Sequence, residues 1–116
     1  MHPEQLAQLV VEALDEVKAV NVRVIDVRGI TSITDFMVIA SGRTDRQVRA
    51  MAKKVEVMAK EHGVASLGME GQREGEWVLL DLGDVVVHAM QPAARDFYQI
   101  EKLWADAAGQ ERSAVH

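Results

Sequence analysis

The sequence contains no cysteine, which excludes disulfides, thiol redox chemistry and thiolate metal sites and fits a reducing compartment. It also lacks an apolar run of the roughly 18 residues that a membrane-spanning helix needs. The first residues, Met1, His2, Pro3 and Glu4, do not form a signal peptide. We therefore expect a cytoplasmic protein with no membrane partner.

Positive charge is scarce as well. The chain has 13 Lys and Arg residues against 18 Asp and Glu residues, giving a formal net charge of −5. Non-specific binding to nucleic acid depends on Lys and Arg side chains that neutralise phosphates. An acidic chain suits that role poorly unless its cations cluster, and it is better matched to a basic protein partner.

What the sequence does contain is typical of a soluble globular protein. Hydrophobic residues make up 48% and charged residues 27% of its 116 positions. A chain of this length forms one domain that buries roughly two-thirds of its unfolded surface. We expect the domain to span residues 1–105, and the small and polar residues 106–116 to form a flexible C-terminal tail.

Apolar periodicity predicts helices and strands in the order α-β-β-α-β-β-β-α. The expected helices are residues 3–19, 45–62 and 93–104, and the expected strands are residues 22–27, 36–41, 66–69, 77–82 and 85–90. This order favours an α/β (α+β-like) fold in which helices cover a mixed sheet of about five strands. Pro3 and Pro92 suit first helical positions. Thr44 and Gln47 form a capping-box pattern, and Gly63 suits a helix end.

A β-hairpin is expected around Gly83 and Asp84, where two turn residues separate two apolar runs. This turn would pair Leu82 with Val85 and, at the far end, Trp77 with Met90. Side chains alternate between faces along a strand. One face would then be aliphatic, with Val78, Leu80, Leu82, Val85, Val87 and Ala89. The other would carry Trp77, Leu79, Asp81, Val86, His88 and Met90, a mixture that packing alone would not select.

The aromatic residues are few, at 4% of the chain, and most lie between Trp77 and Trp104. Protein interfaces concentrate Trp, Tyr and Arg, and a few such residues dominate affinity. On a last helix that could be bent, Phe97 and Trp104 would share the stripe of Ala93 and Ile100, which predicts a core position for both. Trp77 and Tyr98 lie off the aliphatic faces, so we expect them at an interface.

Catalytic and metal-binding patterns are largely missing. The histidines His2, His62, His88 and His116 show no paired spacing for a metal. Ser41 lacks the nucleophile-elbow motif that a Ser–His–Asp triad would need. Asp81 and His88 are expected to lie near each other, as a structural or interface pair. Positive charge gathers on the second helix, at Arg46, Arg49, Lys53 and Lys60. This basic face is either solvated or in contact with phosphate or an acidic surface.

Two blocks of the sequence resemble one known family. The first block carries Trp77, Asp81, Gly83, Asp84, His88, Arg95, Tyr98, Glu101, Leu103 and Trp104, and the second is TDFMVIASGRTDRQVRAMA, residues 34–52. Together they cover most of residues 3–105. Their combination resembles the ribosomal silencing factor, or Iojap, family, whereas neither block alone would be specific.

The resemblance implies a fold related to nucleotidyltransferases but without catalytic residues, since no Asp-x-Asp pair occurs. It also implies a factor, homodimeric when free, that needs no cofactor, metal or small-molecule substrate. This factor would bind ribosomal protein L-fourteen on the large subunit and sterically block subunit joining, which represses translation. The residues assigned to partner binding are Trp77, Asp81, His88, Met90, Arg95, Tyr98, Glu101, Leu103 and Trp104. Those assigned to a possible peripheral contact with ribosomal RNA are Arg46, Arg49 and Lys53.

Two other readings stay open on the residues themselves. One is an enzyme of the nucleotidyltransferase or phosphate-handling class that would use Asp26, Asp81 and Asp84. Against it, Ser41 precedes Gly42, the reverse of the Gly-Ser order that marks nucleotidyltransferases. The other is a plain dimerisation module with no ribosome contact.

Overall fold

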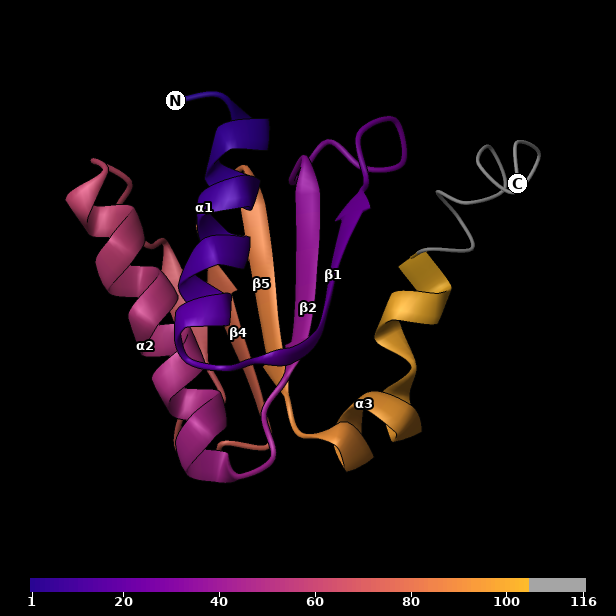
Figure 1. Cartoon of the computed structure of the whole chain (residues 1–116). Coiled ribbons are helices and arrows are strands. Elements are labelled where there is room, and N and C mark those ends of the chain that lie inside the picture. Colours follow the sequence, from indigo (N-terminus) through magenta and orange to yellow (C-terminus); the bar gives the residue numbers. More distant parts are fainter. Residues whose placement is uncertain (105–116) are drawn as a thin grey trace.

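The computed structural model describes residues 1–104. In chain order its elements are α1 (Pro3–Glu16), β1 (Val20–Asp26), β2 (Phe36–Ser41), α2 (Asp45–Glu61), β3 (Gly68–Glu70), β4 (Trp77–Asp81), β5 (Val85–Met90) and α3 (Pro92–Tyr98) (Figure 1). A short helical stretch, residues 100–104, follows α3. The predicted order of helices and strands is confirmed. The predicted tail, residues 106–116, lies outside the described residues.

The five strands form one mixed sheet in the order β1-β2-β5-β4-β3. Only the central pair, β2 and β5, is parallel, and the other neighbours run antiparallel. A parallel pair requires a long connection, which α2, β3 and β4 provide between β2 and β5. The predicted fold class, a mixed sheet of about five strands with helices, is therefore confirmed.

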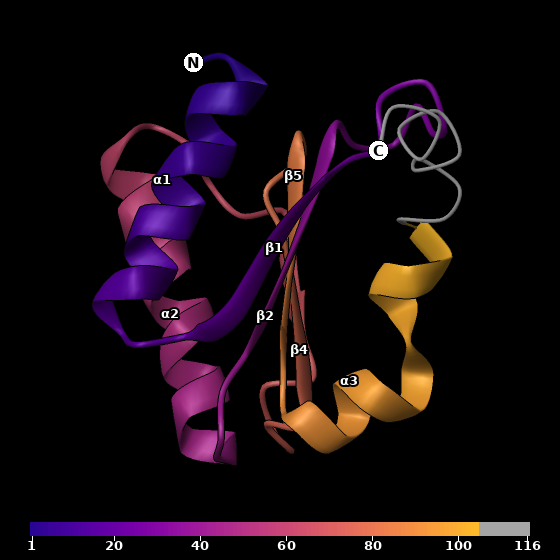
Figure 2. The ribbon, with the colours of Figure 1, turned by 45° about the vertical axis from the view of Figure 1, so that its right-hand side comes forward.

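Helices cover the two faces of the sheet unequally (Figure 2). On one face α1 and α2 bury a large aliphatic core with the inward side chains of β2, β4 and β5. On the other face α3 and residues 100–104 contribute to a smaller core around Ile25, Met37, Ile39 and Met90. All six residues of β2 are buried, as expected for a central strand between two covered faces.

The hairpin of β4 and β5 forms in the predicted register. Trp77 pairs with Met90, Leu79 with His88 and Asp81 with Val86. Gly83 adopts a φ of +86° in the turn, a conformation that a residue with a Cβ adopts only with strain. The aliphatic face of the hairpin lies in the larger core, so the other face is directed toward α3.

The helix ends follow the sequence signals with one change. Pro3 and Pro92 begin α1 and α3, and the Thr44 hydroxyl accepts the Gln47 N–H at 3.0 Å. The Gln47 side chain, however, accepts from the Arg43 N–H at 2.7 Å instead of from Thr44. The predicted capping box is therefore only half formed.

Four predicted elements have a boundary that differs from the structure by two residues or more. The first helix, predicted to end at residue 19, ends at Glu16, and the first strand, predicted to begin at residue 22, begins at Val20. The strand predicted at residues 66–69 begins two residues later, at Gly68.

The single last helix predicted at residues 93–104 is broken at Gln99, whose φ of 49° is left-handed. Ile100 and Trp104, after the break, pack against the smaller core as predicted, but α3 itself buries Ala94 there instead of Ala93 and Phe97. Phe97, predicted to be a core residue, is 80% exposed.

Candidate protein-binding surface

Four rings from three elements form a continuous cluster, which we call the aromatic cluster: His88 of β5, Trp77 of β4, and Tyr98 and Phe97 of α3. The Trp77 ring centroid lies 5.9 Å from that of His88 and 4.9 Å from that of Tyr98. Tyr98 and Phe97 meet edge to face, also at 4.9 Å. Such tilted and edge-to-face arrangements are the favourable ones for aromatic pairs.

The cluster runs from the protein interior to the solvent. His88 is 3% exposed, Trp77 is half-buried, Tyr98 is 52% exposed and Phe97 is 80% exposed. The hairpin register places Trp77 diagonally across from His88 on one face. Pro92 begins α3 directly after β5, so the chain folds back and lays Tyr98 against Trp77 (Figure 1).

His88 contacts Trp77, and the predicted contact between His88 and Asp81 is wrong. The Trp77 indole N–H donates to His88 Nδ1 at 2.9 Å, whereas the Asp81 carboxylate accepts from the Gly83 N–H at 2.8 Å and so caps the turn. Trp77 and Asp81 are both diagonal neighbours of His88 in the register, so the two hydrogen bonds, and not the register, decide which of them His88 contacts. Burial lowers the pKa of His88 to about 4, so the imidazole is neutral near pH 7.

The other nitrogen of His88 has no partner. Its Nε2 is buried and makes no hydrogen bond within residues 1–104. Leaving one polar group buried and unpaired costs about 1–3 kcal/mol. An apolar side chain of similar size would avoid that cost, so packing alone does not account for a histidine at this position.

Arg95 and Glu101 form a buried clamp between α3 and the stretch that follows it. The Arg95 side chain is only 10% exposed. Its Nη2 donates to one carboxylate oxygen of Glu101 at 2.9 Å and its Nε donates to the other. Its Nη1 donates to the Ser41 hydroxyl at 2.9 Å. The hydrogen bonds from Arg95 are the main reason that the pKa of Glu101 lies below its ordinary value.

The residues assigned to partner binding therefore divide into two groups. Tyr98 and Leu103 are exposed, and Trp77 and Asp81 are half-buried. Met90 has no exposed surface and packs in the smaller core, where the half-buried Trp104 joins it. Met90, Trp104, His88 and the Arg95–Glu101 clamp form the second group, which lies beneath the exposed residues and supports them. Phe97 is the exposed aromatic that sequence reasoning missed.

The charge around the aromatic cluster is mostly negative. Glu76 and Asp96 are exposed neighbours of Trp77 and Phe97 in the sequence, and Asp81 is half-exposed on the same strand as Trp77. Of the cations in the same segment, Arg95 is paired with Glu101, and Lys102 is exposed. A basic partner would find complementary charge here, which chiefly increases association rates and specificity.

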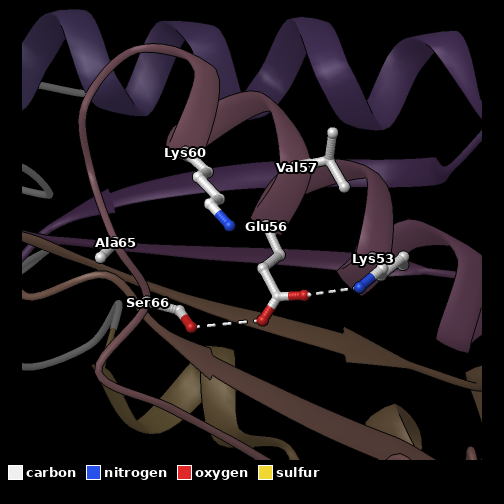
Figure 3. A pocket seen from close by; sticks show the side chains of 6 residues that line it. All are labelled: Lys53, Glu56, Val57, Lys60, Ala65 and Ser66. Atoms are coloured by element: carbon white, nitrogen blue, oxygen red, sulfur yellow. Dashed lines mark hydrogen bonds and ion pairs between the residues drawn. The ribbon is translucent and has the colours of Figure 1, made fainter.

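Two of the four basic residues predicted on α2 are paired with carboxylates. Arg49 bonds Asp45 at 2.9 Å, and Lys53 bonds Glu56 at 3.2 Å. Figure 3 shows the Glu56 carboxylate between Lys53 and Ser66. These three residues and Lys60 line a hollow of about 350 Å³. Arg49 lies beside Gly75, two residues before Trp77. The first turn of α2 is therefore near the aromatic cluster, while the rest of the helix covers the opposite face of the sheet (Figure 2).

Two of the three carboxylates considered for an enzyme, Asp26 and Asp81, bond neighbouring groups of the chain. Within residues 1–104, no group of three or more His, Asp or Glu side chains could hold a metal ion. Arg28 donates to the two carboxylate oxygens of Asp26 at 3.0 and 2.8 Å, so Asp26 stabilises a loop. No helix in this part of the chain is long and apolar enough to cross a membrane.

Comparison with known proteins gives consistent matches. The whole chain, residues 1–116, matches the sequence model of the family described as "Ribosomal silencing factor during starvation". Ribosomal silencing factor RsfS of Chromobacterium violaceum is 46% identical over 104 residues, which cover 90% of this chain and 85% of that protein. RsfS of Haemophilus influenzae is 44% identical over 100 residues, covering 86% and 98%. A crystal structure of a Chromobacterium violaceum protein superposes with a TM-score of 0.89 at 46% identity, covering 90% and 88% of the two chains.

Proposed function

Because this chain belongs to the ribosomal silencing factor family, we propose that it binds the large ribosomal subunit in the cytoplasm and prevents the small subunit from joining. Membership of the family makes it a regulator that acts by binding, not an enzyme. The family description refers to starvation, so we propose that it represses translation when nutrients are limiting.

The aromatic cluster is the observation that carries this proposal. Phe97, Tyr98 and Leu103, all from the C-terminal segment, are 80%, 52% and 71% exposed. Large apolar side chains left together in water mark interaction sites, and buried Tyr and Trp anchors supply most of the affinity of an interface. The neighbouring carboxylates favour a basic ribosomal protein, and we propose that this protein is L-fourteen.

The proposed mechanism is steric. A domain of 116 residues bound on the subunit-joining surface occupies the space that the small subunit would fill. We propose that Arg46 and Arg49, in the first turns of α2, contact ribosomal RNA at the edge of this site, with Arg49 exchanging Asp45 for a phosphate. Lys53 lies further along the helix, so we expect a smaller contribution from Lys53.

The decisive experiment compares exposed residues of the C-terminal segment, Tyr98 and Leu103, with an exposed residue at the far end of the hairpin. Tyr98→Ala should weaken co-sedimentation with large subunits about thirtyfold, the effect of losing roughly 2 kcal/mol at an interface anchor. Its melting temperature should change little, because Tyr98 is 52% exposed. Retained binding by Tyr98→Ala would place the site elsewhere.

A matched pair of leucines provides the control. Leu103 and Leu67 are 71% and 72% exposed, but Leu67 lies next to Gly83 at the opposite end of the hairpin. Leu103→Ala should weaken binding, and Leu67→Ala should not. Repeating the titration at two salt concentrations with Arg46→Ala and Arg49→Ala tests the RNA contact, since each lost phosphate contact lowers the salt slope by about one unit.

A further inference from the structure

Trp77 is held from two sides. Its indole N–H donates to His88 Nδ1 at 2.9 Å, and its ring packs against Tyr98 at a centroid distance of 4.9 Å and an interplanar angle of 43°. Because Trp77 is only half-buried, packing around it is incomplete. The hydrogen bond supplies a directional restraint on the indole plane against which Tyr98 packs.

This hydrogen bond requires one form of the imidazole. An indole N–H is only a donor, so His88 Nδ1 must be unprotonated and the proton must reside on Nε2. The flanking residues in the sheet register, Leu79 of β4 and Ile39 of β2, are apolar and place no charge beside the ring. Nε2 is buried and has no partner among the described residues. The single polar contact of the His88 side chain is therefore the one with Trp77.

We propose that His88 is a positioning residue for partner binding: by accepting the Trp77 indole N–H, it holds Trp77 and Tyr98 together as one rigid surface. His88 itself, at 3% exposure, does not touch the partner. A surface that is already ordered loses less conformational entropy on binding. This inference rests on the proposed function and separates the residue that orients the surface from the residues that make contact.

Two substitutions distinguish the acceptor from the bulk of the side chain. His88→Leu removes the acceptor and the unpaired donor but keeps an apolar side chain of comparable size. His88→Asn places an amide oxygen near the position of Nδ1 and so restores an acceptor. Both substitutions are made in a Trp104→Phe protein, which serves as their parent. The chain has two tryptophans, so this change leaves Trp77 as the only source of tryptophan fluorescence.

Time-resolved fluorescence anisotropy of Trp77 is measured in the free protein, together with melting temperature and affinity for purified large subunits. We expect His88→Leu to melt at least as high as its parent, to give Trp77 a new fast anisotropy decay and to bind about threefold to tenfold more weakly. That factor corresponds to ordering one side chain on binding. His88→Asn should restore the slow decay and most of the affinity.

Unchanged anisotropy in His88→Leu would overturn the proposal, whatever happens to melting. Equal impairment of His88→Asn and His88→Leu would also overturn it, because side-chain volume and not the acceptor would then be responsible. If the wild-type protein fails to bind large subunits, the proposed function fails. The anisotropy comparison then decides by itself whether His88 orients Trp77.

Discussion

Burial of a single imidazole couples the stability of this protein to pH. Burial lowers the pKa of His88 from the ordinary 6.5 to about 4, because a charged imidazole between Leu79 and Ile39 would be poorly solvated. Between these two values the unfolded chain holds a proton at His88 and the folded chain does not. Stability therefore rises with pH through this window and falls as the pH drops from about 6.5 toward 4.

We predict that His88 accounts for about 3 kcal/mol of stability lost between neutral pH and pH 4, the equivalent of its pKa shift. Urea unfolding of the wild type and of His88→Leu across this range measures the loss. Acidic residues common to both proteins contribute equally, so the difference between the two curves isolates His88. A constant difference across the window would contradict this prediction.

The sequence predicted the face of the sheet on which a side chain lies, because side chains alternate between the two faces along a strand. Alternation along β4 and β5 placed His88 and Trp77 on one face, and the structure brings them together. It could not decide which side chain His88 would contact, because Asp81 and Trp77 share that face. The end of α3 at Gln99 was missed because its left-handed φ usually occurs at glycine, and no glycine marks this position. The exposure of Phe97 was missed as well, because α3 buries Ala94 instead.

At the scale of elements, the position of residues 100–104 depends on the Arg95–Glu101 clamp. This short stretch is too small to be stable by itself. Its attachments are the clamp and the contacts of Ile100 and Trp104 with the smaller core. Since Arg95 belongs to α3 and also bonds Ser41 at the end of β2, one side chain links three segments of the chain.

We predict that Arg95→Met lowers the free energy of unfolding by about 2 kcal/mol or more, because it leaves the Glu101 carboxylate partly buried without its main partner. Hydrogen exchange at the backbone amides of residues 100–104 should accelerate. Arg23→Met is the matched control, since Arg23 contacts the same carboxylate at 3.5 Å from a side chain that is 52% exposed. Equal effects of the two substitutions would show that burial of Arg95 is unimportant.

Elements were predictable where local rules act on them strongly. The turn at Gly83 set the hairpin register, and apolar content identified β2 as a strand covered on both faces. The start of the short edge strand β3 was predicted two residues too early, because a strand of three residues shows too little periodicity to fix its boundary.

At the scale of the whole molecule, the two faces of the sheet are covered to different extents. The larger core under α1 and α2 is extensive, whereas the smaller core is overlain by α3, a helix of seven residues, and the stretch after it. Together with the outer strands β1 and β3, which each pair on one side only, this leaves surfaces that favour self-association.

We predict a homodimer when the protein is free, with the exposed aromatic cluster as part of its interface. Multi-angle light scattering at tens of micromolar, about the concentration at which weak dimers form, should give twice the mass of 12.8 kDa. Phe97→Ser should shift the mass toward that of the monomer, whereas Ile33→Ser, which alters a residue with 85% exposure in another loop, should not. A monomer in all three proteins would refute the dimer.

The order of the segments along the chain also has a consequence for biosynthesis. The aromatic cluster needs β4, β5 and α3, which are the last named elements within residues 1–104, and it is held by the Arg95–Glu101 clamp. A ribosome synthesises these segments after all the other described elements. The aromatic cluster therefore cannot form on a nascent chain until the residues up to Glu101 have left the exit tunnel, later than α1, α2, β1 and β2.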